Sequence, residues 1–314
     1  MRTDRMMVVA RTAGRGIRGR WRGTAVFLGI AFALSAVFWG LMVRAGTATA
    51  NANWLLGLMW SPAIAALAVN VGRYRSLRGL GWGLGRPRFL LLGYAIPVAY
   101  GLVAYGLVWL VGLGHISVPT LSDHLAATFA GFPAGRSPLL AVLFAATVGV
   151  LISMLSAAGE EIGWRGFLVP ELARRTTFTR TAAVSGAVWA LWHLPLLLFA
   201  GYRSDAPLWS ALPCFVVLTL SLSVVLAWLR LRSGSVWPAV LLHASHNLFI
   251  LHVFSPLTVD SGVTRYLVGE DGLALALVGI ALAAVVLWRR RTPETTPTAA
   301  HPGPEPVPSG AHRV

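Results

Sequence analysis

The sequence predicts an all-α fold, a polytopic membrane helix bundle with about eight transmembrane helices. Of the 314 residues, 56% are hydrophobic and only 12% are charged, whereas an ordinary soluble domain carries roughly 25% charged residues. The mean hydropathy is +0.69. So few charges cannot cover a water-soluble core of this size, which argues against a soluble enzyme. The basic residues are all arginine, a composition typical of a GC-rich bacterial genome.

Eight apolar stretches are long enough to cross a bilayer, because a helix needs about 20 apolar residues to span about 30 Å of hydrocarbon. In chain order they lie near residues 24–43, 54–72, 89–113, 138–158, 181–200, 208–229, 236–254 and 270–288. Together they predict a membrane domain over residues 24–288. A basic N-terminal tail, residues 1–23, precedes it. A C-terminal tail, residues 289–314, follows, and its Pro, Thr and Gly content predicts disorder.

Several stretches have features that affect their interpretation. The first precedes Ala-Thr-Ala at residues 48–50, which resembles a signal-peptide cleavage site. We favour an uncleaved span, because about 20 apolar residues exceed a usual signal-peptide core.

The fifth apolar stretch carries Trp189 and Trp192, which we interpret as packing or interface residues. The sixth carries Cys214, the only cysteine, so we expect a buried inert thiol and no internal disulfide. In the seventh, His252 lies near the outer end and needs no special role.

The arginines orient the bundle. With the N-terminus inside, the inner loops and tails hold 22 of the 26 arginines, and the outer loops hold Arg44, Arg136, Arg203 and Arg265. This split fits the positive-inside bias, and an even number of spans returns the C-terminus to the inside. We therefore expect a multi-pass protein of the plasma (cytoplasmic) membrane with both termini cytoplasmic. The same distribution argues against a nucleic-acid partner, despite a net charge of +15.

The fourth apolar stretch continues well past two glutamates and is too long for one upright helix. We therefore expect it to bend, tilt strongly or turn along the inner interface, with Gly159, Gly163, Gly166 and Pro170 as the places where it does so. Any of these paths would place Glu160 inside the inner leaflet.

A few polar side chains lie at membrane depth, where burial is so costly that each is a functional candidate. They are Glu160, Glu161 and Arg165 after the fourth stretch, His193 in the fifth, and His243 and Asn247 in the seventh. At about 1.5 Å per residue, both histidines fall in the inner half of the membrane or near its midplane. Spacings of four place Glu161 beside Arg165, and His243 beside Asn247, on one helix face each.

These residue types suit peptide-bond hydrolysis in a hydrated cavity. A carboxylate in a low dielectric is a stronger base than in water, so Glu160 could activate a water molecule that one histidine holds. The other histidine and the asparagine amide could donate hydrogen bonds to the oxyanion. Arg165 would pair with Glu161 and offset the cost of burying two like charges.

Three motifs in this order resemble those of the CPBP family, named for CAAX proteases and bacteriocin-processing proteins, which includes type II CAAX prenyl endopeptidases and lysostaphin-resistance-like proteins. Glu-Glu-x-x-x-Arg matches Glu160, Glu161 and Arg165; Phe-x-x-x-His matches Trp189 and His193, with tryptophan where phenylalanine is usual; His-x-x-x-Asn matches His243 and Asn247. The motif region covers roughly residues 138–250.

The resemblance implies an eight-helix intramembrane endopeptidase whose site opens to the cytoplasmic side. It implies the following roles: Glu160 activates water beside His193, His243 and Asn247 stabilise the oxyanion, and Glu161 and Arg165 support them. His246 belongs to no motif of the family, and we expect it to be a supporting or packing residue.

The sequence lacks a His-Glu-x-x-His zinc signature, so we favour a metal-free, glutamate-based mechanism without a cofactor. In the zinc alternative, Glu160, His193 and His243 would supply three ligands. Membrane-associated peptides or proteins, such as signal-peptide-like segments or bacteriocin leaders, are the expected substrates. Two other functions use the same residues: a proton-coupled transporter with a Glu/His relay, and a non-catalytic immunity or adaptor protein.

Overall fold

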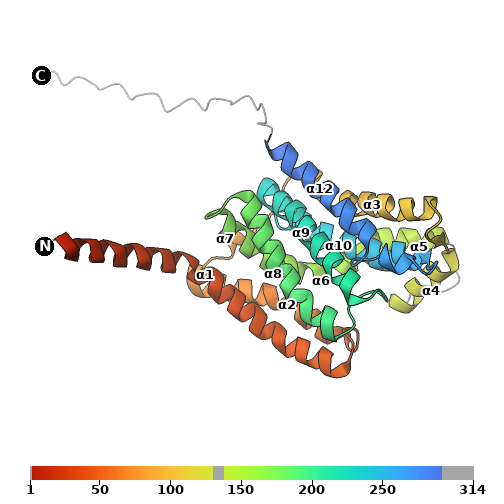
Figure 1. Ribbon diagram of the computed structural model, residues 1–314, viewed down its shortest axis with the longest axis horizontal. Helices are drawn as coiled ribbons and strands as arrows, with labels where there is room; N and C mark the ends of the chain where they lie inside the picture. The colour runs from red at the N-terminus through yellow and green to blue at the C-terminus, as the bar shows by residue number, and fades with distance from the viewer. Residues whose placement is uncertain (1, 130–137, 292–314) are drawn as a thin grey trace, which may run out of the picture.

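The computed structural model describes residues 2–129 and 138–291, and these residues form an almost entirely helical bundle (Figure 1). The helices are α1 (Arg2–Ala45), α2 (Ala52–Val69), α3 (Pro87–Leu110), α4 (Val118–Thr128), α5 (Pro138–Phe144), α6 (Val150–Glu161), α7 (Val169–Ala173), α8 (Phe178–Phe199), α9 (Leu208–Ser233), α10 (Trp237–His246), α11 (Ser255–Leu257) and α12 (Leu273–Arg291). Two short strands, β1 (His115–Ile116) and β2 (Thr258–Val259), pair antiparallel. The predicted all-α class is confirmed.

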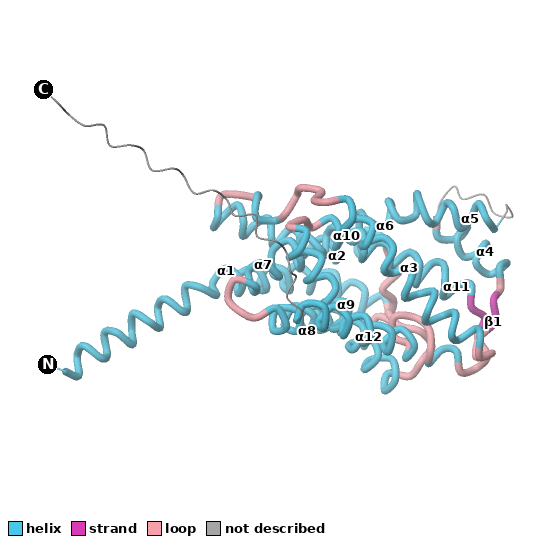
Figure 2. The backbone as a smooth tube through the Cα atoms, turned by 90° about the horizontal axis from the view of Figure 1, so that it is seen from above, coloured by secondary structure: helices cyan, strands magenta, loops and turns pink. Residues whose placement is uncertain are grey.

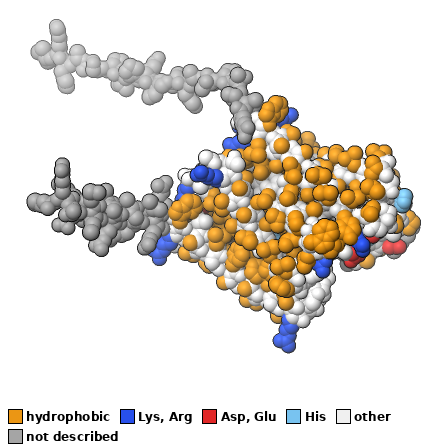
Figure 3. All heavy atoms as spheres, viewed as in Figure 1, with side chains coloured by type: hydrophobic (Ala, Val, Ile, Leu, Met, Phe, Trp, Pro, Cys, Tyr) orange, Lys and Arg blue, Asp and Glu red, His pale blue; other side chains and the backbone are white. Residues whose placement is uncertain are grey.

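Eight helical runs within the described residues are long and apolar enough to cross a membrane, which confirms the predicted number of spans. They are Trp21–Ala45, Ala52–Tyr74, Pro87–Leu110, Leu139–Ala173, Phe178–Phe199, Leu208–Ser233, Trp237–Leu257 and Leu273–Arg290. Hydrophobic side chains cover most of the face seen in Figure 3, as lipid contact requires. The C-terminal tail from residue 292 on, and Arg136, lie outside the described residues.

The central helix of the bundle is α10, which packs against α3, α6 and α9. Helix α2 packs between α1 and α6, and α8 lies beside α9 and α1. The first span begins, and α12 finishes, at one end of the bundle, which we call the terminal end. We call the opposite end the loop end. It contains the connections 46–51, 111–117, 200–207 and 258–272, together with α4 and the strand pair (Figures 1 and 2).

The fourth span runs as one helical stretch from Leu139 to Ala173, with π-helical segments at 145–149 and 162–168. Its 35 residues exceed one upright crossing, as the sequence indicates, and Gly163 and Gly166 lie in the second π-helical segment. Its glycines allow close packing against α2, because a Cβ on Gly159 would lie 2.5 Å from the Met59 carbonyl oxygen and one on Gly163 would lie 2.4 Å from Pro62. Small residues four apart let two helix backbones approach closely. This contact fixes α6, and the two glutamates at its end, against α2.

Candidate active site

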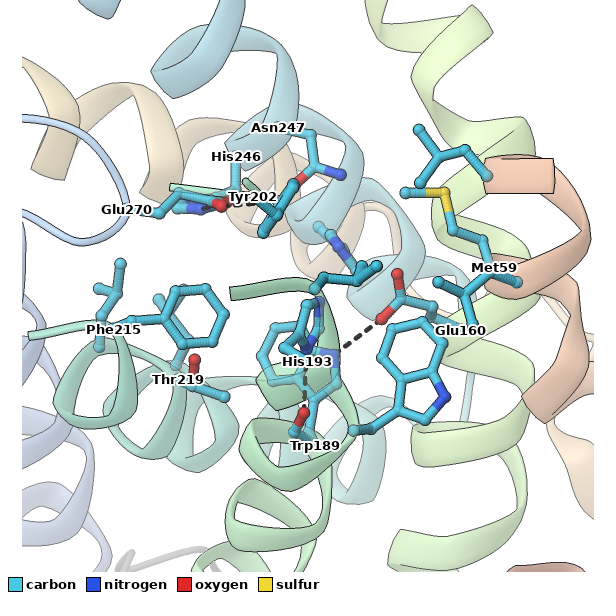
Figure 4. Close-up of a pocket in the computed structure, with 17 residues that line it drawn as sticks. Met59, Glu160, Trp189, His193, Tyr202, Phe215, Thr219, His246, Asn247 and Glu270 are labelled. Atoms are coloured by element: carbon cyan, nitrogen blue, oxygen red, sulfur yellow. Dashed lines mark hydrogen bonds and ion pairs between the residues drawn. The ribbon is translucent and has the colours of Figure 1, made fainter. Parts of the chain in front are cut away.

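A cavity of about 30 Å³ lies inside the bundle, among α2, α6, α8, α9 and α10 (Figure 4). A volume of this size holds one or two water molecules. The polar residues of its lining are Glu160, Trp189, His193, Tyr202, Thr219, His243, His246, Asn247 and Glu270. Four residues predicted from three separate motifs, Glu160, His193, His243 and Asn247, therefore meet around one small cavity.

Glu160 lies in the last turn of α6 and is 1% exposed. Its Oε2 accepts a hydrogen bond of 2.7 Å from the indole Nε1 of Trp189 in α8 (Figure 4). Trp189 is buried, as expected of a packing residue, and its N–H also binds the candidate catalytic carboxylate. A phenylalanine at this position has no donor and could not make the bond.

Glu161 forms the predicted pair with Arg165, and both side chains are fully buried. The Arg165 Nη1 lies 2.7 Å from Glu161 Oε1, and the same oxygen lies 2.9 Å from His243 Nδ1. The guanidinium also donates to the Ser223 hydroxyl at 3.1 Å and lies over the Trp189 ring, 4.3 Å from its centroid. Bidentate or multiply bonded guanidinium groups hold their partners in fixed geometry. The pair therefore connects the position of His243 to α6.

His193 has a defined ring orientation. Its Nδ1 lies 2.9 Å from the Trp189 carbonyl oxygen, and because a carbonyl only accepts, Nδ1 carries the proton. In the neutral tautomer with this proton, Nε2 is unprotonated and can accept a hydrogen bond from water. The ring is 8% exposed and is enclosed by the rings of Trp192, Tyr202 and Phe215.

The position of His193 along α8 follows from where this helix begins. The Thr177 side chain caps α8 by accepting a hydrogen bond from the Arg180 amide, so the helix begins at Phe178. At about 1.5 Å per residue, His193 lies about 22 Å from the terminal end of α8 and about 9 Å from Phe199 at its loop end. It thus lies nearer to the loop end of its helix, while His243 lies in the first half of its own span. The depth of both residues in the membrane stays a prediction.

Asn247 and His243 share one face, as their spacing predicts. Asn247 follows the last residue of α10 and begins a π-helical segment, Asn247–Phe254. Both residues line the cavity, and among the described residues the Asn247 side-chain amide has no hydrogen-bond partner. π-Helical turns often occur at functional sites because the extra residue redirects side chains.

The sequence analysis missed a second polar group at the cavity. His246 hydrogen-bonds the Tyr100 hydroxyl through Nδ1, and its Nε2 lies 2.8 Å from Glu270 Oε1. The Tyr202 hydroxyl donates to Glu270 Oε2 at 2.9 Å. Of the two roles expected for His246, these contacts favour the supporting one, since it lines the cavity and contacts a carboxylate. In the sequence, Glu270 and Asp271 at the edge of the last apolar stretch could have indicated this group, because acidic residues are costly there.

Glu270 and Tyr202 lie in connections between helices, and their pKa values show which of the two carries a charge. Burial by itself would raise the pKa of Glu270, but the hydrogen bonds from His246 and Tyr202 lower it to about 2. Burial and the nearby Glu270 carboxylate raise the pKa of Tyr202 well above its ordinary value. Glu270 is thus ionised and Tyr202 is neutral at physiological pH, which fixes Tyr202 as the donor.

The described residues form no ready-made metal site. Within residues 2–129 and 138–291, no group of three or more His, Cys, Asp and Glu side chains is placed to hold a metal ion. Of the zinc ligands considered, His243 and His193 have their Nδ1 atoms engaged by Glu161 and the Trp189 carbonyl. The choice between metal-free and zinc chemistry stays a prediction.

The matched region coincides with the predicted motif core. Residues 137–249 match a family model described as type II CAAX prenyl endopeptidase Rce1-like. Over 104 residues, the chain is 28% identical to a protein named CAAX prenyl protease 2 from Methanococcus maripaludis, and the alignment covers 32% of this chain and 38% of the relative. The chain thus spans less than half the length of that relative. Both findings show that part of this chain is similar to CAAX-type prenyl endopeptidases.

Proposed function

We propose that this chain is an intramembrane endopeptidase that hydrolyses peptide bonds of membrane-associated peptides or proteins, with Glu160 as the base that activates water. One observation carries the proposal: a carboxylate from α6, a histidine from α8, and a histidine and an asparagine from the α10 region line one buried cavity with room for water. The resemblance to CAAX-type proteases over the same residues supports this reaction class.

The attack on the substrate uses Glu160 and His193. The Nε2 of His193 accepts a hydrogen bond from the water and holds it near Glu160. Glu160 takes one proton from the water as its oxygen bonds to the carbonyl carbon of the scissile peptide. The Trp189 N–H keeps the carboxylate in place during this step, since it already binds Oε2.

The negative charge that forms on the carbonyl oxygen needs donors. The Asn247 amide offers an N–H with no other partner in the described residues, and the His243 Nε2, when protonated, offers a second. Glu161 balances the charge of that imidazolium through its contact with Nδ1. When the intermediate collapses, the C–N bond breaks and Glu160 returns its proton to the leaving amine nitrogen.

The metal-free mechanism is the version we favour, because each step above uses only side chains of this chain. In the zinc version, the ion would bind the remaining nitrogens of His193 and His243 with Glu160, and would polarise the water. Cleavage measured after exhaustive chelation, with and without added Zn²⁺, separates the two: we expect activity to persist.

The transporter and adaptor alternatives use the same residues but predict other products. A transporter would move substrate across the bilayer without new peptide ends. An adaptor would keep its phenotype when Glu160 is replaced. The enclosure of the cavity by fixed tryptophan, histidine and guanidinium contacts favours hydrolysis over both.

The decisive experiment compares the peptides in membranes that contain the wild-type chain, Glu160→Gln or Asp123→Asn. The glutamine keeps the size of Glu160 but cannot take the proton, and a general base contributes roughly 10²–10⁴-fold, so cleavage products should fall at least about 100-fold. Asp123 is an exposed carboxylate on α4, and its variant should cleave normally. Full cleavage by Glu160→Gln would refute the proposal.

A further inference from the structure

A basic depression lies on the surface of the terminal end, where the α2–α3 connection meets the end of α9. Its volume is about 460 Å³, and three arginines, a serine and two apolar residues line it: Arg86, Arg88, Arg232, Ser233, Phe89 and Leu231. No Asp or Glu of the described residues belongs to this lining. The described lining is therefore positively charged, and it shares no residue with the active-site cavity.

The elements around this depression are held in fixed positions. The Trp237 indole N–H, in the first turn of α10, donates to the Trp82 carbonyl oxygen in the α2–α3 connection at 2.7 Å. The buried Phe89 ring packs edge-on against Trp228 of α9, with the ring centroids 6.1 Å apart. The lining thus belongs to elements that are already ordered, which reduces the entropy that a ligand would lose on binding.

Arg86 and Arg88 keep their hydrogen-bond donors available for a ligand. In the part of the chain that the structure describes, neither guanidinium makes a hydrogen bond or an ion pair. The Arg88 guanidinium lies over the Phe89 ring, 4.9 Å from its centroid, and stacking on a ring leaves the N–H groups at the edge of the guanidinium accessible. The Glu171 carboxylate cannot neutralise them, because it pairs with two other arginines and lines a different cavity.

Exposed apolar side chains continue from this depression along α3. Leu91 and Leu92 follow Arg88 by three and four residues, so they lie on the same side of the helix, about one turn further into the span. Both are exposed, and Leu91 is 68% exposed. Because this candidate membrane span begins at Pro87, the arginines lie at the level of lipid headgroups and the leucines at the level of acyl chains.

The phosphate group is the anion that suits clustered arginines, because a guanidinium presents paired N–H donors that match phosphate oxygens. Basic pockets between transmembrane helices accordingly bind the headgroups of acidic lipids. A free phosphate ion would use only the arginines, whereas a phospholipid would also cover the exposed leucines with its acyl chains. The apolar face beside the arginines therefore favours a lipid over a soluble anion.

We propose that the depression lined by Arg86, Arg88 and Arg232 is a binding site for an anionic phospholipid. The phosphate lies among the guanidinium groups, and an acyl chain follows α3 past Leu91 and Leu92. Both leaflets of a membrane contain phospholipids, so the site does not depend on which side the terminal end faces. It is also independent of the proposed proteolysis, because none of its residues lines the active-site cavity.

The test measures lipid binding to the full chain in detergent micelles by native mass spectrometry. The probes are phosphatidylglycerol and phosphatidylcholine with the same acyl chains, and we expect the wild-type chain to bind phosphatidylglycerol preferentially. Arg86→Gln combined with Arg88→Gln removes two charges, each worth a factor of about five near anionic lipid, so the affinity for phosphatidylglycerol should fall roughly 30-fold. The matched control, Arg75→Gln with Arg78→Gln, removes two exposed arginines of the same connection outside the depression and should leave the affinity unchanged.

The lysine pair Arg86→Lys with Arg88→Lys shows whether a loss of binding reflects charge or misfolding. Because it keeps both charges, it should retain most of the affinity for phosphatidylglycerol. Unchanged binding by the glutamine pair, or equal binding of phosphatidylcholine and phosphatidylglycerol by the wild-type chain, would overturn the proposal.

Two further measurements separate a lipid from a soluble anion and locate the bound molecule. In calorimetric titration of the micellar protein, inorganic phosphate should not bind at concentrations at which phosphatidylglycerol saturates the site; tight phosphate binding that is lost in the glutamine pair would refute the lipid assignment. In membranes, a phosphatidylglycerol with a photoreactive group in its acyl chain should crosslink to Leu91 or Leu92. Crosslinks confined to helices other than α3 would also refute it.

Discussion

Replacing Glu270 with glutamine measures how much its hydrogen bonds with His246 and Tyr202 contribute to the free energy of unfolding. The side chain is 13% exposed and accepts hydrogen bonds from His246 and Tyr202. A bond to a charged group contributes about 1 to 1.5 kcal/mol more than a neutral one, so two such bonds give about 2 to 3 kcal/mol. The pKa of Glu270, lowered from 4.5 to about 2, corresponds to about 3 kcal/mol. Both values describe the same hydrogen bonds from His246 and Tyr202.

The pH dependence of stability follows from the same pKa. Because the pKa is lower in the folded protein than in the unfolded chain, the ionised Glu270 stabilises the fold above about pH 4.5, and this stabilisation is lost as the pH falls from 4.5 through 2. Unfolding in detergent micelles, followed by tryptophan fluorescence, should show Glu270→Gln less stable by about 3 kcal/mol at pH 7. The difference from wild type should shrink below pH 4.5. Equal stability of the two proteins at pH 7 would refute this account, and Asp123→Asn controls for the loss of an exposed charge.

Three further substitutions test the packing around the site. Arg165→Leu leaves the fully buried Glu161 carboxylate without its cationic partner, and unfolding measurements should show a loss of about 3–5 kcal/mol. Gly163→Ala forces a Cβ to within 2.4 Å of α2, so the yield of folded protein should fall, whereas Gly29→Ala, with open space around it, should fold normally. Trp189→Phe keeps an aromatic ring but removes the N–H that binds the proposed catalytic carboxylate; a charge-assisted bond of about 1.5–3 kcal/mol predicts roughly 10- to 100-fold slower cleavage, measured as kcat.

The number and order of the spans followed from the sequence because the membrane imposes a simple requirement. A helix must present about 20 apolar residues to lipid, and that pattern is visible without knowledge of the neighbours. The path of the fourth span was not predictable in this way. Its glycines were expected to mark bends, but whether a glycine bends a helix or admits a neighbour depends on what lies against it. Here the backbone of α2 lies against Gly159 and Gly163.

The candidate site was also predictable only in part. Residues at a spacing of four on one helix were paired correctly, since helix geometry alone decides their distance. The structure also brings Glu160, His193, His243 and Asn247 to one cavity, as the motifs suggested. Contacts between helices were missed. The Trp189 bond to Glu160 joins residues 29 apart in the chain, and the Tyr202 bond to Glu270 joins residues 68 apart. No local pattern indicates these contacts, because they depend on how the helices pack.

The two adjacent glutamates differ in their partners, and this difference supports distinct roles. Consecutive helix residues project about 100° apart, so Glu160 and Glu161 contact separate surroundings. Glu161 accepts from a guanidinium and an imidazole, so two neighbouring side chains hold its carboxylate. Glu160 accepts from one neutral indole N–H and lines the cavity. These contacts support the proposal that Glu160 takes the proton of a water molecule and that Glu161 holds His243 and Arg165 in place.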